Sequence, residues 1–275
     1  MVAKGIYSFS NKRQIWRLIP TDTEKLIIEE RDTENKEVFF NCLHIFTGEK
    51  IFSEFQLEEK FWVGIEAINN DVIYFHKFVK PDMPEHRGII AFDIKSKIIL
   101  WENPDYSFLF IDDDKIYCYK SFFEGRKFFA IDCKSGKLVK ELGGNTSEIN
   151  RLRDVALSKQ SYKEYLFSKI YYPDDLNDKR ISKIFKDLKS EKVVAGNIEY
   201  AIYNDVLFFN FHEVLDNGLL KNTFKGIDLK NYELIIEELL ISETKVFMPD
   251  SFFLLRNLMF LLEEKNRLVV YELKS

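Results

Sequence analysis

The sequence predicts an all-β fold, a six-bladed β-propeller closed by its N-terminal strand, and two observations lead to this prediction. A phrase consisting of an apolar pair, a marker residue, a turn and a second apolar run recurs along the chain at intervals of 39 to 55 residues. Between two recurrences lie four short runs rich in β-branched and aromatic residues, separated by Asp, Gly and Ser. Repeats of about 40 to 50 residues that contain four strands are typical of propeller blades.

The composition is that of a folded chain without long linkers. Apolar residues make up 46% of the 275 residues, including 26 Phe and 13 Tyr, whereas Pro and Gly number only 6 and 11. A chain of this length buries a sizeable core either as one large domain or as two smaller ones. Because the repeat extends over the whole chain, we expect a single domain over residues 1–275.

Charge and cysteine content exclude several classes of partner and compartment. Forty basic against 45 acidic residues give a net charge of -5, the opposite of the balance that nucleic-acid binding favours. No apolar run reaches the roughly 18 residues that span a bilayer, and the N-terminus lacks the apolar core of a signal peptide. Three cysteines without CxxC spacing, Cys42, Cys118 and Cys133, indicate reduced thiols. We therefore expect a cytoplasmic protein without membrane or nucleic-acid partners.

The marker residue of the recurring phrase is most often aspartate. Asp at the start of a tight turn accepts backbone N–H bonds, so each repeat needs one independently, and we interpret the markers as structural rather than as a shared site. The carboxylate run at residues 111–114 is likewise interpreted as a solvated turn. The six markers are His44, Asp93, Asp132, Asp187, Asp228 and Glu272.

Four of the blades have a clear set of strands. Short runs of Val, Ile, Tyr and Phe bounded by turn residues predict strands joined by tight turns. The expected ranges are 14–20, 25–32, 37–45 and 50–56 in the first blade, 62–69, 71–78, 88–94 and 98–103 in the second, 107–112, 115–122, 127–133 and 137–142 in the third, and 198–204, 205–214, 223–229 and 232–239 in the fifth.

The remaining two blades are less regular. An irregular insertion at about residues 143–163 interrupts the fourth blade, where Thr146, Ser147 and Glu148 are able to cap a short helix; an irregular inner strand, or a seventh blade, are the alternatives. The sixth blade offers only three strands, at 251–257, 258–264 and 267–273. We expect residues 4–10 to supply its fourth strand, because this closure removes exposed sheet edges.

The phrase from Asp93 to Trp101 and that from Asp132 to Leu142 resemble the repeat of quinoprotein-type, or PQQ-like, β-propellers. The whole-chain pattern also resembles a bacterial family of uncharacterised propeller-like proteins. The resemblance implies the fold. Quinoprotein dehydrogenases bind their quinone with a stacked Trp, a disulfide of adjacent cysteines and a calcium ion. Because this chain has no adjacent cysteines and only Trp101 keeps the repeat position, we predict no quinone and no other cofactor.

Histidines and carboxylates offer few candidates for catalysis. His76 and His212 lie in the second strands of their blades, at positions we interpret as equivalent and structural, and His44 stands at a turn marker. His86 lies in a loop beside Asp82 and Glu85, where a divalent metal is one interpretation and a solvated loop is the preferred one. GxSxG, HExxH, GxGxxG and Walker-type sequences are absent. We therefore predict no catalytic residue and no metal site.

The longer loops, expected on one face of the propeller, are the predicted location of function. We predict a non-catalytic module that binds an unknown protein or small ligand on this long-loop face. The alternative is a propeller enzyme, a metal-dependent hydrolase or lyase, with its site at the channel mouth. The candidate binding residues are Asp82, Glu85, His86, Arg87, Asp105, Tyr106, Glu124, Arg126, Asp174, Asp175 and Asp216.

Overall fold

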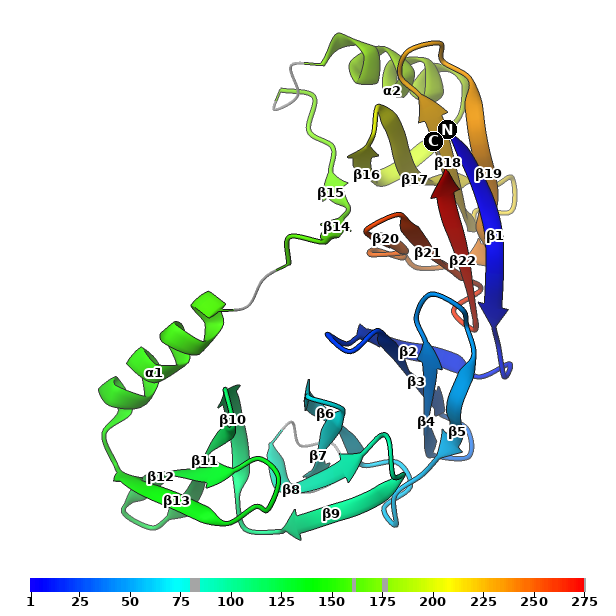
Figure 1. The fold of residues 1–275 in the computed structure, drawn as a ribbon. Helices are drawn as coiled ribbons and strands as arrows, with labels where there is room; N and C mark the ends of the chain where they lie inside the picture. Colours follow the sequence, from blue (N-terminus) through cyan, green and yellow to red (C-terminus); the bar gives the residue numbers. More distant parts are fainter. Residues whose placement is uncertain (80–84, 160–161, 175–177, 275) are drawn as a thin grey trace. The chain divides into compact units, whose positions relative to one another are not determined.

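The computed structural model describes residues 1–79, 85–159, 162–174 and 178–274, which form antiparallel sheets and two helices. Contacts divide the chain into two compact units (Figure 1). Residues 15–161 form the first, here called the three-sheet unit, and residues 1–14 together with 162–275 form the second, the two-sheet unit. Each unit is described by itself, and the expectation of a single domain stays a prediction.

The three-sheet unit consists of three four-stranded sheets, each with its strands in chain order. This meander is the organisation expected of propeller blades. The strands are β2 (Gln14–Pro20), β3 (Lys25–Asp32), β4 (Glu37–His44) and β5 (Lys50–Phe55), then β6 (Val63–Asn69), β7 (Val72–Phe78), β8 (His86–Asp93) and β9 (Ile98–Asn103), and finally β10 (Ser107–Asp112), β11 (Lys115–Phe122), β12 (Gly125–Asp132) and β13 (Leu138–Gly143).

Aromatic and aliphatic side chains bury the faces between these sheets. Phe40, Phe75 and Phe92 pack the first sheet on the second, with the Phe40 and Phe75 ring centroids 4.7 Å apart. Tyr74 and Ile131 belong to the cluster between the second and third sheets. Strand alternation sends Phe75 to one side of β7 and Tyr74 to the other, so both faces of the middle sheet are buried.

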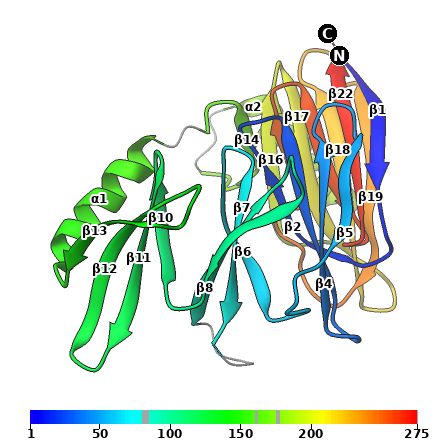
Figure 2. The same cartoon turned by 60° about the horizontal axis from the view of Figure 1, so that its bottom comes forward.

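Helix α1 (Thr146–Lys159) follows β13 and packs on the third sheet, as Figure 2 shows. Ile149 and Ala156 on its buried side contact the cluster that contains Phe110 and Phe128. The side chain of Asn145 accepts a hydrogen bond from the Glu148 N–H (3.2 Å) and so caps the helix. The insertion at residues 143–163 is therefore largely helical, the first of the alternatives that the sequence left open.

The two-sheet unit contains two five-stranded sheets. One has the order β1 (Val2–Phe9), β22 (Arg267–Lys274), β21 (Leu258–Glu263), β20 (Phe252–Leu255) and β14 (Tyr165–Phe167). The other has the order β15 (Lys169–Ile170), β16 (Val194–Tyr203), β17 (Val206–Val214), β18 (Leu220–Asp228) and β19 (Leu234–Thr244). Phe208, Phe224 and Met259 belong to the core between them.

Strand β1 pairs antiparallel with β22, Tyr7 lying opposite Val270, so the N-terminal strand completes the last sheet as predicted. The fourth blade is where the prediction was wrong. Asp187 lies inside helix α2 (Lys179–Glu191), which packs Ile181 and Phe185 in a cluster with residues of the β15–β19 sheet. Within the described ranges the strands form five sheets, so the count of six blades is not confirmed.

The other five markers occupy one register position. Each marker lies opposite the first residue of the strand that precedes its own in the chain, as Val72 lies opposite Asp93 and Val206 opposite Asp228. The same holds for His44, Asp132 and Glu272. Asp93 and Asp132 accept hydrogen bonds from the backbone N–H and hydroxyl groups of Ser96 and Ser135, which confirms the turn role predicted for them.

All three cysteines are buried and free, as predicted. Neither of the helices in the described part of the chain is long and apolar enough to cross a membrane.

Candidate functional site

Three of the residues predicted for binding line one pocket of the three-sheet unit. Glu85, Arg87 and Asp105 border a pocket of about 410 Å³ together with Lys120. Lys120 Nζ lies 3.1 Å from Asp105 Oδ2, and the Arg87 guanidinium lies 3.9 Å from the same carboxylate. The charges on the pocket wall thus neutralise one another.

Three more of the candidates have structural contacts in the same unit or lie in solvent. Tyr106 is 8% exposed, and Lys120 Nζ lies 4.6 Å from the centroid of its ring. The Arg126 guanidinium stacks 4.4 Å from the ring centroid of Tyr119, and Glu124 is exposed in the neighbouring hairpin turn.

Asp174 and Asp216 are exposed residues of the two-sheet unit, and the structure does not join them to the others. Asp82 and Asp175 lie outside the described residues.

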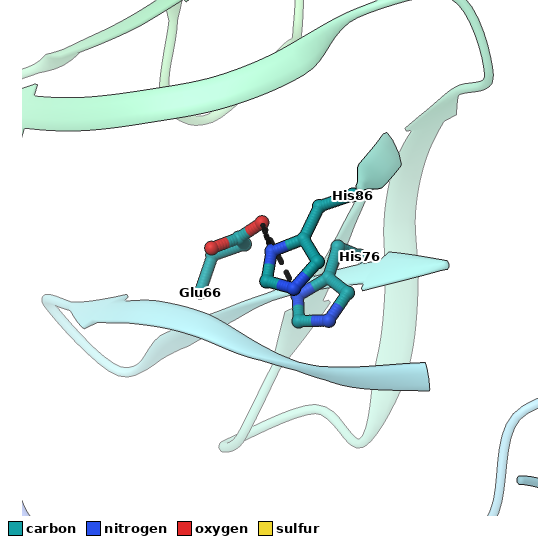
Figure 3. A group of neighbouring side chains, drawn as sticks. All are labelled: Glu66, His76 and His86. Carbon is teal, nitrogen blue, oxygen red and sulfur yellow. Dashed lines mark hydrogen bonds and ion pairs between the residues drawn. The ribbon is translucent and has the colours of Figure 1, made fainter. Parts of the chain in front are cut away.

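His86 belongs instead to a compact group with Glu66 and His76 (Figure 3). The imidazole rings of His76 and His86 are stacked, with centroids 3.5 Å apart and planes inclined by 7°. Both Nδ1 atoms face Glu66 Oε1, at 3.2 Å from His76 and 2.9 Å from His86. One carboxylate oxygen therefore bridges two imidazoles contributed by β7 and β8.

Two β-bulges bring these side chains together. On β6, Ile65 and Ala67 pair with the consecutive residues Phe75 and Tyr74, which leaves Glu66 as the extra, unpaired residue. A bulge re-aims the side chain of its extra residue, and here that side chain points at the histidines.

The second bulge lies between β7 and β8, beside His76. Phe75 pairs with Ile90 but Lys77 pairs with Arg87, so two residues of β8, one of them Gly88, lie opposite His76. Gly88 has φ +78°, a conformation that glycine adopts without strain. His86 then lies opposite Phe78, on the same face as His76, because cross-strand pairs share a face and residues two apart on a strand do too.

The group is buried on the His76 side and open on the His86 side. The side chain of His76 is 3% exposed, that of Glu66 14% and that of His86 38%. His76 Nε2 makes no hydrogen bond within the described part of the chain. Phe78 contacts both imidazoles edge to face, at 5.0 Å between ring centroids.

Burial and the bridging carboxylate determine the ionisation of this group. Burial lowers the pKa of His76 and outweighs the carboxylate of Glu66, which favours the charged imidazole. Burial opposes ionisation of Glu66, but the two imidazoles together outweigh it and lower the pKa of that carboxyl. At neutral pH we therefore expect Glu66 to be ionised and His76 to be neutral, with one ring nitrogen that carries a lone pair.

Glu66 also lines a cleft of the three-sheet unit, about 800 Å³ in volume. Its walls are strands β6 and β10, the turns that follow them, and the second half of α1. Its lining contains five acidic side chains and two basic ones. The acidic residues are Asp22, Glu66, Asp112, Asp113 and Asp114, and the basic residues are Arg153 and Lys159. The cleft lies where the first strands end in short turns, not among the long loops where the sequence predicted function.

Glu66 and His76 were missed by the sequence interpretation. His76 was assigned a structural role equivalent to that of His212, yet it is the fifth residue of β7 and His212 the seventh of β17. The available signal was that His76 and His86 flank one hairpin loop, so that pairing the two strands brings them to neighbouring positions. Nothing in the sequence marked the bulge that turns Glu66 toward them.

Comparisons with known proteins give one family match. Residues 19–101, from β2 to β9, match the model of a domain of unknown function, DUF4905. This range contains Glu66, His76 and His86. No curated protein matches the chain.

Solved structures show only distant similarity. A europium-containing methanol dehydrogenase is 11% identical with a TM-score of 0.33, and the match covers 90% of this chain and 57% of that one. The Dos1 propeller is 8% identical with a TM-score of 0.31, covering 94% and 68%. An uncharacterized protein of Listeria monocytogenes EGD-e is 12% identical with a TM-score of 0.34, covering 96% and 95%. Such low TM-scores assign neither a fold nor a function to this chain.

Proposed function

We propose that this protein is a β-propeller-like binding module that holds a small polar ligand in the cleft between β6, β10 and α1. The observation that carries the proposal is the cleft itself. Its volume of about 800 Å³ lies within the range of roughly 300–1,000 Å³ typical of small-molecule sites. Its lining offers carboxylate, amide, guanidinium and ammonium groups at one surface.

The walls of the cleft are held in place by polar contacts. Lys159, at the end of α1, lies 2.6 Å from Asp112 Oδ1 and 3.1 Å from Asp113 Oδ2. The side-chain amide of Asn69 donates to the carbonyl oxygen of Asp113 (3.0 Å), which links the turn after β6 to the turn after β10. A wall ordered before the ligand arrives reduces the entropic cost of binding.

The meander topology supports the propeller part of the proposal. Each sheet of the three-sheet unit has its four strands in sequence and packs face to face on the next, and the first strands of the second and third sheets, β6 and β10, border the cleft. Propellers bind ligands near the first strands of their blades, where residues distant in sequence meet.

A matched pair of substitutions on α1 tests the proposal. Leu157 lines the cleft and is 52% exposed, whereas Val155 is 42% exposed and is not part of the lining. Leu157→Trp should fill the cleft and abolish binding of a hit found by ligand-observed NMR in a mixture of sugars, hydroxy acids, amino acids and nucleosides. Val155→Trp should leave that binding unchanged. The proposal fails if no compound binds, or if both variants lose the hit equally.

The second candidate function is a metal-dependent hydrolase or lyase. The observation that favours it is the group of two imidazoles and the carboxylate of Glu66, of which Glu66 lines the cleft; such a donor set is found in hydrolytic zinc sites. Turnover of activated esters or sugar lactones by the zinc-supplemented protein, lost in Glu66→Gln, would support it. Turnover that persists in Glu66→Gln would contradict it.

A further inference from the structure

We propose that Glu66, His76 and His86 form a site for one divalent transition-metal ion, of which zinc is the best match. The inference concerns these three side chains alone and does not require a ligand in the cleft. Two imidazole nitrogens and one carboxylate oxygen suit zinc and its first-row neighbours, whereas calcium and magnesium prefer sets made of oxygen atoms.

The spacing of the donor atoms is that of a metal site. The two Nδ1 atoms lie 2.9 and 3.2 Å from Glu66 Oε1. Bonds of about 2.0 Å to a tetrahedral zinc ion place neighbouring ligand atoms about 3.3 Å apart. All three donor atoms lie within 4.8 Å of one another, so rotation of the side chains brings them to one face of such a tetrahedron.

Binding requires two local changes. Both Nδ1 atoms must be deprotonated, so that each binds the ion through its lone pair. The rings must also rotate out of their parallel stack so that the two lone pairs converge on the ion. His86 is 38% exposed and has room to rotate, whereas His76, packed beside Gly64, provides the fixed donor.

Burial and charge favour a cation at this place. His76 is nine-tenths buried and its Nδ1, which faces the site, makes no hydrogen bond within the described residues, which is costly for a side chain with only a packing role. The adjoining cleft carries more acidic than basic side chains, which raises the local concentration of cations. Three protein ligands leave the fourth position for water or for a molecule bound in the cleft, as in catalytic zinc sites.

The experiment is cobalt and zinc titration of the EDTA-treated full-length protein. We expect one Co²⁺ per chain with the intense visible absorption of a tetrahedral site, displaced by one equivalent of Zn²⁺ and measured independently by calorimetry. His86→Ala should weaken zinc binding by more than about tenfold. The matched control is His44→Ala, because His44 is also 38% exposed and lies 4.0 Å from a carboxylate, that of Glu24.

Glu66→Gln is the second variant, because it preserves the shape of the side chain and guards against loss of the fold in the histidine variants. Its circular dichroism should match the parent while its zinc affinity falls. The proposal is overturned if the parent takes up no metal, if His44→Ala weakens binding as much as His86→Ala, or if Glu66→Gln binds zinc as tightly as the parent. In those cases the trio is a hydrogen-bonded structural cluster.

Discussion

The middle sheet of the three-sheet unit and the β15–β19 sheet of the two-sheet unit use the same register position in opposite ways. The fifth residue of β7 is His76 and the fifth residue of β17 is Asn210, and both are almost fully buried. Opposite His76 lies Gly64, and opposite Asn210 lies Glu199. A polar residue at this position must find partners, and the neighbouring strands decide which.

In the β15–β19 sheet the partners form a chain of hydrogen bonds. The amide of Asn210 donates to Asn222 Oδ1 (3.4 Å), and the amide of Asn222 donates to Ser251 Oγ (3.2 Å). Ser251 in turn donates to the Met248 carbonyl (2.9 Å). The chain of donors ends on the backbone, which is the pattern of a structural network, and Asn210 Oδ1 is the member left without a hydrogen bond within the described residues.

In the middle sheet the partners converge on one point. Gly64 makes room for the His76 ring, while the bulged Glu66 faces its Nδ1 and His86 stacks on it. Three groups that bind cations then face one another. The comparison teaches that the repeated architecture supplies a buried polar position in both sheets. Whether that position has a structural role or belongs to a ligand site depends on the residue that occupies it and on the bulge at Glu66.

The largest effect that separates the two regions is expected at Asn222. Asn222→Ala leaves the amide of Asn210 and the hydroxyl of Ser251 without their side-chain partners in a buried environment, and should cost about 2–3 kcal/mol of unfolding free energy. Urea denaturation measures it. The control is Asn217→Ala, whose exposed amide pairs with Glu243 and whose removal should cost less than about 0.5 kcal/mol. Equal effects would show that the buried network contributes no more than a surface contact.

A smaller effect is expected at Gly64, which sets the space beside His76. A Cβ at this position would lie 2.9 Å from His76 Cε1 and 3.0 Å from the Arg17 guanidinium. Gly64→Ala should therefore cost about 1–2 kcal/mol, as overpacking does, and should displace the imidazole from Glu66.

The matched control for Gly64 is Gly5→Ala in β1, where the nearest atom to a Cβ, on Tyr271, lies 3.8 Å away. Thermal unfolding of both variants compares them, and the His76 ring resonances report its displacement. If Gly64→Ala is as stable as Gly5→Ala and leaves those resonances in place, the close packing around His76 does not hold the trio together.

Sequence reasoning predicted the fold wherever the repeat is regular. Turn residues and alternation located the strands of four sheets, and the marker phrase identified one register position in five places. Asp187 shows the limit. It stands in a phrase like the others, but Ile181, Phe185 and Leu188 also have helical spacing. As a helix this segment buries all three side chains in the cluster that contains Phe209.

The candidate site was predictable only in part, for a reason of the same kind. His86 was identified because the sequence pattern placed it in a charged loop, although it is the first residue of β8, and Glu85, Arg87 and Asp105 do share a pocket. Glu66 and His76 sit within strands whose patterns resemble ordinary core segments. Their meeting depends on two bulges, each a shift of a single residue in register, and strand periodicity does not encode such shifts.

The smallest expected effect concerns how stability changes with pH. Two glutamates of the two-sheet unit, Glu199 and Glu213, should contribute to it with opposite signs. Burial raises the pKa of Glu199, and hydrogen bonds from Asp250 and Asn210 offset only part of this. The folded state therefore holds the proton more tightly, and its stability falls as pH rises from the ordinary glutamate range, roughly 4.3, through the raised pKa. Glu199→Gln should remove this loss, so that the variant gains stability relative to the parent near pH 7 but not near pH 4.

Glu213, on the adjacent strand β17, should respond with the opposite sign. Its hydrogen bond with Lys192 is the largest influence and lowers the pKa of the carboxyl, with Lys221 adding to it. A lowered pKa stabilises the fold above the unfolded value and is lost as pH falls, so Glu213→Gln should destabilise the protein near pH 7 and have little effect in acid. Urea unfolding of the parent and both variants at several pH values measures these differences in unfolding free energy. If the stability changes of the two variants instead follow the same course with pH, burial does not outweigh the hydrogen bonds that Glu199 accepts.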